Sequence, residues 1–349
     1  MKRLLPVLIV LIILFALGAV LPKFGSDAVT ASVAVAPEVI FHIGSFPVSN
    51  TLLTTWIVMI LVLWFAFSAT RKMSMVPNGL QNVFEMAIEM WDTLGRNVAG
   101  ERNKMFFPFV MTIFLFVLFS NYLGLIPGFG PIGIIPIKEG EHAPEGIVTF
   151  DLPFGLGKVL GAHPESLKAA SEHSDPANEP KTTESEAPLL APFVRSPSTD
   201  INTTLALALI SMVTAQIFGM KVVGPLKYWT KFFNFGKVGQ FFVSLFKGKP
   251  NFGLLFYGFI DLFVGILEFV SEIVKVVSFT FRLFGNIFAG EVVLLIMAFL
   301  GSTFYFFGMP FVFYALELFV GFMQAFVFGI LTLVFMTIAT TSHSAEEHH

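Results

Sequence analysis

The chain has 349 residues, of which 55% are hydrophobic and only 13% are charged. A soluble domain carries roughly twice that charged fraction, and 44 phenylalanines exceed what one aqueous core could use. The formal net charge of −3 excludes the basic footprint that nucleic-acid binding needs, so no nucleic-acid partner is expected. The absence of cysteine excludes disulfides, thiolate nucleophiles and cysteine metal sites. The composition therefore predicts an integral membrane protein.

Several apolar stretches are long enough to supply the roughly 20 helical residues that cross a bilayer. The first, at 4–22, follows Lys2 and Arg3; we interpret it as a retained helix, although 34–36 would also suit signal-peptide cleavage. Further stretches lie at 52–69, 105–127, 201–220, 252–300 and 310–341. The expected fold is an all-α integral membrane protein with about six membrane helices, of which the last two form a long tilted hairpin.

Lysines and arginines predict the orientation, because they concentrate in cytoplasmic loops. If Lys2 and Arg3 are cytoplasmic, successive crossings place most of the other basic residues on the cytoplasmic side, including the lysines of 221–249. The opposite side receives 138–199, which is rich in acids, proline and serine. This distribution predicts that both termini are cytoplasmic and that 138–199 is an external, mostly irregular loop.

Four regions are therefore expected. Residues 1–50 form the N-terminal membrane helix and an external segment; 51–137 form the first membrane helices; 138–199 form the acidic external loop; and 200–349 form the channel helices. Within the second region, 79–98 alternates apolar and polar residues at helical spacing. Such a pattern suits an amphipathic helix on the cytoplasmic membrane surface, or one packed on a partner subunit.

The stretch 252–300 carries an unusual polar stripe. Its charged residues at seven-residue spacing are Asp261, Glu268, Lys275 and Arg282. Steps of seven stay on one helix face, and the stripe extends about 32 Å, close to the hydrocarbon thickness. As one helix the whole stretch would measure about 70 Å, so it is expected to be tilted, bent or broken.

Arg282 differs from the other charged residues of the stripe. A charge at mid-membrane costs at least about 2.5–3.5 kcal/mol, and no acidic residue lies within one turn of Arg282. Its partner is therefore expected on another helix or another protein. Glu268 and Glu272 can instead pair with Lys275 at helical spacing, so a structural role for those three stays as open as a functional one.

The last two helices can be aligned as an antiparallel hairpin that turns within 301–309. Glu291 and Glu317 are both about 13 residues from the centre of this turn, at position 304 or 305. The alignment therefore places them at the same depth in the membrane. Two carboxylates in one apolar site cannot easily both ionise, so this level is predicted to be a proton-accepting station.

A second level forms closer to Arg282. Gln324 reflects onto about Gly285, within one helical turn of Arg282, and Asn286 lies at the same level. Neither level contains a nucleophile or a metal-binding triad, and no histidine lies in any predicted span. The sequence therefore predicts ion conduction without catalysis, a cofactor or a metal.

Three motifs carry a family resemblance. The run SFTFRLFGNIFAGE at 278–291 closely resembles the signature helix of subunit a of F-type ATP synthases. The run MQAFVFGILT at 323–332 is similar to the last helix of that family, and PSTDINTT at 197–204 to the entry of its preceding span. The resemblance covers most of 52–341 except the acidic loop.

By this resemblance, Arg282 is the essential arginine that faces the rotor ring and separates two proton half-channels. The other residues that would line the proton path are Asn286, Glu291, Glu268, Gln324 and Glu317. Glu317 stands where some members have histidine, and Val276 where many have proline. The implied partners are the c-ring rotor subunits, the peripheral-stalk b subunits, the rest of the F1Fo complex and the lipid bilayer, in a bacterial plasma membrane.

A charge argument supports the same role independently. A rotor carboxylate that faces lipid stays protonated, because desolvation raises its pKa. At about 4 Å from Arg282 it would gain about 4 kcal/mol at an effective dielectric near 20, or about three pKa units, which is enough to release the proton. Arginine suits this role because it does not itself release a proton.

Two other classes were weighed against this interpretation. A secondary transporter with an anionic substrate at Arg282 would predict two related halves with broken helices, and no internal repeat is found. An intramembrane enzyme would need a nucleophile or a metal set in the spans. The conducted ion is expected to be H⁺ rather than Na⁺, because no oxygen-rich coordination cluster is evident.

Overall fold

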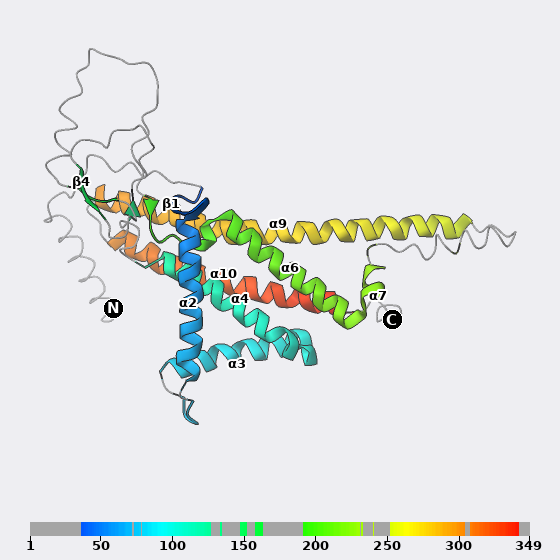
Figure 1. Ribbon diagram of the computed structural model, residues 1–349. Helices are drawn as coiled ribbons and strands as arrows, with labels where there is room; N and C mark the ends of the chain where they lie inside the picture. The colour runs from blue at the N-terminus through cyan, green and yellow to red at the C-terminus, as the bar shows by residue number, and fades with distance from the viewer. Residues whose placement is uncertain are drawn as a thin grey trace, which may run out of the picture. The chain divides into compact units, whose positions relative to one another are not determined.

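The computed structural model describes 36–71, 73–77, 79–126, 133–134, 147–151, 158–162, 191–230, 232, 240, 252–303 and 308–341. Within these residues, four helical stretches are long and apolar enough to cross a membrane, namely Asn50–Thr70, Leu80–Gly124, Ile201–Val223 and Phe311–Thr340. The predicted all-α membrane class is confirmed (Figure 1). The predicted first helix, 4–22, lies outside the described residues, so the total of six crossings stays a prediction.

The helices are bounded as follows: α2 Asn50–Thr70, α3 Leu80–Ala99, α4 Asn103–Gly124, α6 Ile201–Val223, α7 Pro225–Trp229, α9 Phe252–Thr303 and α10 Gly308–Thr340. Short 3₁₀ turns occupy Gly100–Arg102 and Pro197–Thr199. Helix α9 runs unbroken for 52 residues and contains no proline, the residue that would most readily break it. The sequence predicted that this stretch would be tilted, bent or broken, and the continuous helix excludes a break.

Three antiparallel strand pairs were not predicted. Strand β1 (Val39–Ile43) pairs with β2 (Phe46–Ser49), β3 (Gly133–Ile134) with β6 (Ala191–Pro192), and β4 (Ile147–Asp151) with β5 (Lys158–Ala162). Strands β4, β5 and β6 lie in the loop 138–199, which was expected to be mostly irregular, and β3 lies just before it. Strands of two to five residues are too short to give a clear alternation of apolar and polar residues, which is why sequence analysis missed them.

The chain divides into two compact units. Unit 1 comprises Met1–Val62, Phe119–Asp200 and Ile287–Gly321, and unit 2 comprises Leu63–Leu118, Ile201–Asn286 and Phe322–His349. Helices α2, α4, α9 and α10 each contribute residues to both units.

In unit 1, the segment 195–200 is tied to three helices by buried polar contacts. Asp200 accepts a hydrogen bond at 2.9 Å from the Thr51 hydroxyl of α2. Ser198 donates to Asn121 Oδ1 of α4 at 2.6 Å, and Asn121 Nδ2 donates to the Gly321 carbonyl of α10 at 3.0 Å. These buried polar groups thus have partners in apolar surroundings, which ties the segment before α6 into unit 1.

In unit 2, the amphipathic helix α3 is anchored on its neighbours by Trp91. This side chain is 1% exposed, and its ring lies 5.1 Å from that of Phe114 in α4 and 5.5 Å from that of Phe326 in α10. Asn103 Nδ2 donates to Asp92 Oδ1 at 2.8 Å, which fixes the corner between α3 and α4. The helix therefore packs at Trp91 within this chain, while part of its apolar face, including Leu80 and Val83, stays exposed.

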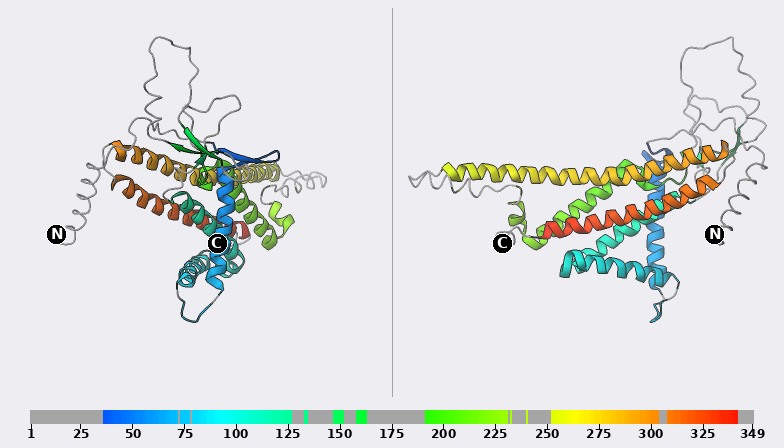
Figure 2. Two further views of the ribbon diagram at one scale, coloured as in Figure 1. Left: turned by 60° about the vertical axis from the view of Figure 1, so that its left-hand side comes forward. Right: turned by 180° about the vertical axis from the view of Figure 1, so that it is seen from behind.

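Helices α9 and α10 run antiparallel, as the hairpin alignment predicts. In unit 2 the ring of Phe279 packs against Phe328 and Phe335, with centroid separations of 4.8 and 5.3 Å. Further along α9, Asn286 contacts Gln324, which comes earlier in α10 than Phe328 and Phe335. Later residues of α9 therefore contact earlier residues of α10, as in an antiparallel pair. Figure 2 shows these helices from two further directions.

The contact between α3 and α10 gives a stability prediction. A Cβ added at Gly329 would lie 2.6 Å from Trp91 Cη2, and the buried ring has no room to move away. We expect Gly329→Ala to destabilise the protein by about 1–3 kcal/mol through overpacking. The measurement is the midpoint of thermal unfolding of the purified chain in detergent.

The matched control is Gly285→Ala, because a Cβ there meets nothing within 4 Å. Its midpoint should be unchanged or higher, since alanine favours the helix over glycine. Equal midpoints for the two variants would contradict the close packing of Trp91 on Gly329.

Candidate functional site

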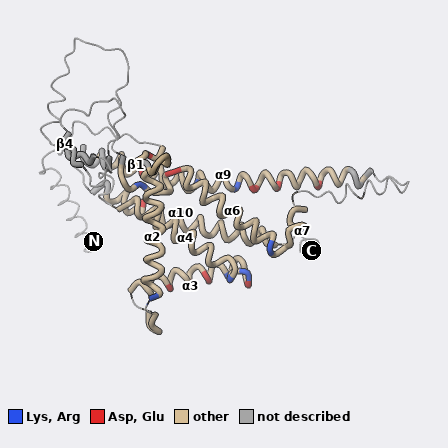
Figure 3. Tube along the Cα trace, viewed as in Figure 1, with Lys and Arg blue, Asp and Glu red and all other residues tan. Residues whose placement is uncertain are grey.

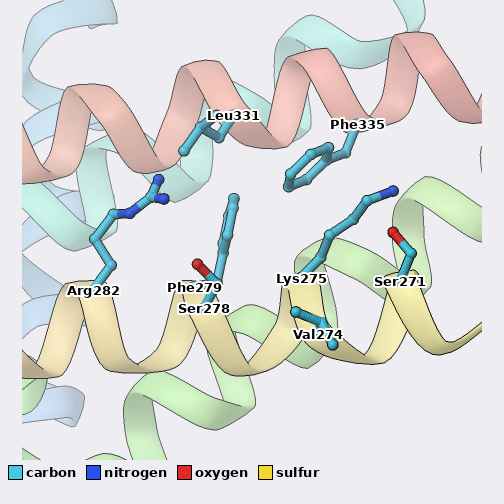
Figure 4. A pocket seen from close by; sticks show the side chains of 8 residues that line it. All are labelled: Ser271, Val274, Lys275, Ser278, Phe279, Arg282, Leu331 and Phe335. Atoms are coloured by element: carbon cyan, nitrogen blue, oxygen red, sulfur yellow. The ribbon is translucent and has the colours of Figure 1, made fainter.

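Arg282 lies on the face of α9 that is turned toward α10, and it lines a pocket of about 230 Å³ within unit 2. The pocket is lined by Ser271, Val274, Lys275, Ser278, Phe279, Arg282, Leu331 and Phe335. Figure 4 shows Arg282 and Lys275 both reaching from α9 toward α10, with the ring of Phe279 between them. The sequence-predicted stripe thus brings two of its cations to one pocket.

Arg282 is exposed, and among the described residues it makes no ion pair. A guanidinium carries five N–H donors and stays charged at every physiological pH. In surroundings made of phenylalanine, leucine and valine, this charge can be offset by an anion from outside the chain. That geometry agrees with the expectation that the partner of Arg282 comes from elsewhere.

Asn286 and Gln324 meet as the hairpin alignment predicts. Asn286 Nδ2 donates to Gln324 Oε1 at 2.7 Å, one helical turn beyond Arg282 in α9. Gln324 is 5% exposed, and its Nε2 has no acceptor among the described residues. A buried amide donor without an acceptor is costly, so this level retains hydrogen-bonding capacity next to the arginine.

Lys275 forms an ion pair with Glu272, as helical spacing allows. Its Nζ lies 2.8 Å from Glu272 Oε1, and the two side chains are 26% and 16% exposed. Glu272 also accepts a hydrogen bond at 3.0 Å from Gln216 in α6, a contact that the sequence did not reveal. Glu268 lies on the same helix but is not among the residues that line the pocket. The charged residues along α9 are visible in Figure 3.

In unit 1, Glu291 is paired with Arg195, a residue that sequence analysis assigned only to the acidic loop. Arg195 Nε lies 3.2 Å from Glu291 Oε1, and the arginine side chain is 5% exposed against 40% for the glutamate. The backbone N–H of Arg195 donates to Thr54 in α2 at 3.2 Å, and its Nη1 donates to the Ala36 carbonyl at 3.3 Å. Arg195 is therefore held by the fold, with its guanidinium directed at Glu291.

The carboxyl group of Glu38 also interacts electrostatically with Arg195. Burial raises the pKa of Glu38, the positive charge of Arg195 opposes that rise, and the negative charge of Glu291 adds to it. Glu38 lies just before β1, outside the membrane helices. Two carboxyl groups therefore compete for one buried cation, and Glu38 retains a proton to higher pH than a solvated glutamate does.

Glu317 lies against α9 at Gly290. This glutamate is 5% exposed, and a Cβ added at Gly290 would stand 2.1 Å from its carboxyl carbon. Only a glycine leaves room for the carboxyl group at this depth. The alignment predicted Glu317 opposite Glu291; the contact that the structure gives is with the neighbouring residue, while Glu291 faces Arg195.

The arrangement offers two kinds of chemistry. One is a fixed positive charge at Arg282 that has no carboxylate of its own among the described residues. The other is a pair of carboxyl groups, Glu291 and Glu317, of which one is ion-paired and one is buried against a helix backbone. No cluster of three metal-ligating side chains occurs in the described part of the chain. The groups suit attraction of an anion and transfer of protons.

Comparison with known proteins gives one consistent result. The sequence matches the family described as "ATP synthase A chain" over residues 52–337. It is 29% identical over 331 residues to "ATP synthase subunit a" of Gloeobacter violaceus, covering 94% of this chain and 98% of the relative. It is 28% identical over 309 residues to the protein of the same name from Moorella thermoacetica, covering 88% and 99%. For that of Syntrophobacter fumaroxidans the identity is 29% over 301 residues, covering 86% and 88%.

The contact at Gly290 can be tested with introduced cysteines, because the chain has none of its own. We expect Gly290→Cys with Glu317→Cys to form a disulfide on mild oxidation, because the Glu317 side chain reaches position 290, where an added Cβ would lie 2.1 Å from its carboxyl carbon. A disulfide joins two such neighbouring positions when their Cβ atoms are roughly 3.5–4.5 Å apart. The measurement is the mobility shift of the full-length chain in non-reducing electrophoresis.

The comparison pair is Glu291→Cys with Glu317→Cys, which should cross-link more slowly because position 291 points about 100° further round the helix. Faster cross-linking of the second pair would contradict the contact of Glu317 with Gly290.

Proposed function

Because this chain belongs to the ATP synthase A chain family, we propose that Arg282 is the fixed charge past which it moves protons to and from the carboxylates of a rotor c-ring. The chain is an integral membrane, proton-translocating and non-catalytic subunit of ATP synthase. The single observation that carries the proposal about Arg282 is an exposed guanidinium on a membrane helix that makes no ion pair within the described residues.

The electrostatic reason is the difference between lipid and the pocket. A carboxyl group in lipid is neutral, because burying its charge costs several kcal/mol. Beside Arg282 the ionised form is stabilised, so the proton leaves before the carboxylate passes and another proton is taken up afterwards. Since arginine keeps its own proton, it blocks direct proton exchange between two half-channels.

Polar groups of α9 and α10 are proposed to line these half-channels. Glu291 and Glu317 supply carboxyl groups that can accept and release protons, and Arg195 holds one of them in place. Asn286 and Gln324 supply hydrogen-bond partners next to the arginine. Glu268 is proposed to line the path further toward the N-terminus of α9, where its side chain is half-buried.

Membership of ATP synthase sets the wider context. The chain functions within the F1Fo complex. Its direct neighbours are proposed to be the c-ring, the peripheral-stalk b subunits and the lipid bilayer. A bacterial plasma membrane with both termini in the cytoplasm is proposed from the bacterial relatives and from the distribution of lysine and arginine.

The first prediction concerns Arg282. Arg282→Ala and Arg282→Lys should both abolish proton-driven ATP synthesis, because alanine removes the charge and a lysine beside the proton path can lose its proton. ATP synthesis in membrane vesicles with an imposed proton gradient is the measurement. Arg96→Lys is the control, since Arg96 forms an exposed pair with Asp92 on α3 and should remain active.

Assembly must be checked in parallel by the amount of subunit in the purified complex. Coupled synthesis at more than a small fraction of the wild-type rate in either Arg282 variant would refute the proposed role.

The second prediction concerns Glu317. Glu317→Gln keeps the shape of the side chain but cannot transfer a proton, so proton flux should fall by at least about ten-fold. Glu317→His should retain much of the flux, because imidazole exchanges protons near neutral pH. ATP-driven acidification of inverted vesicles measures both. If glutamine conducts as well as glutamate, Glu317 is a structural contact.

A further inference from the structure

Lys275 is the second cation of the Arg282 pocket, and the fold holds its ammonium group from two sides. Its Nζ lies 2.8 Å from Glu272 Oε1 and 5.1 Å from the ring centroid of Phe335, across the pocket in α10. Arg282 has no such ion pair among the described residues. The two cations are two helical turns, or about 10.5 Å, apart along α9.

Glu272 is itself held in place from outside its helix. Its other oxygen, Oε2, accepts a hydrogen bond at 3.0 Å from Gln216 Nε2 in α6. The Gln216 carbonyl in turn accepts one from the hydroxyl of Tyr228 in α7. The amide therefore cannot turn over without breaking both bonds, and it presents its N–H to Glu272.

Tyr228 fixes the far end of this chain of contacts. It is 4% exposed, and a Cβ added at Gly219 would lie 2.5 Å from its ring, so the ring is closely packed on α6. Burial, and then the negative charges of Glu272 and Glu268, raise the pKa of Tyr228, so its hydroxyl stays a donor. Three elements of unit 2 thus converge on the orientation of one carboxylate.

We propose that Glu272 is a positioning residue that restrains Lys275, so that Arg282 is the cation a rotor carboxylate meets. This inference rests on the proposed function of Arg282. Without Glu272, the ammonium group of Lys275 would be released into the pocket as a second positive charge. A carboxylate would then be held at Lys275 as well as at Arg282, and the rotor would pause there.

The test is a double-mutant cycle in the complete ATP synthase. In the native background, Glu272→Gln should slow ATP-driven proton pumping by about ten-fold, the effect of a trap about 1.4 kcal/mol deep. The same change is then made in a Lys275→Met variant, and the rate of the double variant is compared with that of Lys275→Met alone. This second ratio should be less than about two-fold, because no lysine remains to be released.

A role of Glu272 in carrying protons would give a different result. Glu272→Gln would then slow pumping by the same factor whether or not Lys275 is present, and that outcome would overturn the inference. An undiminished rate in the single variant would overturn it as well. Glu272→Asp, measured for partial recovery, and the quantity of assembled complex distinguish misfolding from a change in rate.

Two further measurements complete the experiment. Gln216→Leu and Tyr228→Phe should each slow pumping less than Glu272→Gln does, and Lys275→Met should remove their effects too. Arg282→Ala in the same vesicles separates the two proposals: if that variant still pumps, the proposed function fails. If Arg282→Ala is inactive and Lys275→Met gives no rescue, only the restraint of Lys275 fails.

Discussion

The cost of placing charge in an apolar environment is the constraint on which the described structure depends. Burying the charges of Arg195 and Glu272, whose side chains are 5% and 16% exposed, has a desolvation cost that close contacts and added hydrogen bonds must offset. The Arg195 guanidinium meets this condition through the Ala36 carbonyl, and the Glu272 carboxylate through Gln216. Arg282 alone among these groups is left without a counter-ion in the described residues, and that exception supports its proposed role.

Helix α9 can carry this set because it is continuous. In unit 2 the helix keeps Glu272, Lys275 and Arg282 in a fixed angular and axial relation, which a broken helix would not do. Packing of Phe279 against Phe328 and Phe335 holds α10 antiparallel to α9 in unit 2. The result within unit 2 is a fixed arrangement of charges, as the proposed encounter with a rotor carboxylate requires.

The sequence predicted the helices and the hairpin alignment well, because helical rise and antiparallel direction are enough to match Asn286 with Gln324. It could not predict Arg195 as the partner of Glu291, since the two are 96 residues apart and the arginine precedes a span rather than lying in one. The one signal in the sequence was the position of this basic residue shortly before α6, and that position alone does not name a partner. The contact of Gln216 with Glu272 could not be predicted either, because a single amide in an apolar helix is compatible with many partners.

The contrast between Lys275 and Arg282 explains why two cations in one pocket need not have one role. Lysine is a compact charge on a flexible chain, so its position depends on whatever holds its ammonium group. Arginine carries a planar group with five donors and needs no restraint to remain charged. A membrane helix that must attract one carboxylate at one place therefore gains from pairing the lysine and leaving the arginine open. The same number of charges, with the pairing reversed, would give an attractive site that can lose its proton and with it the barrier between the half-channels.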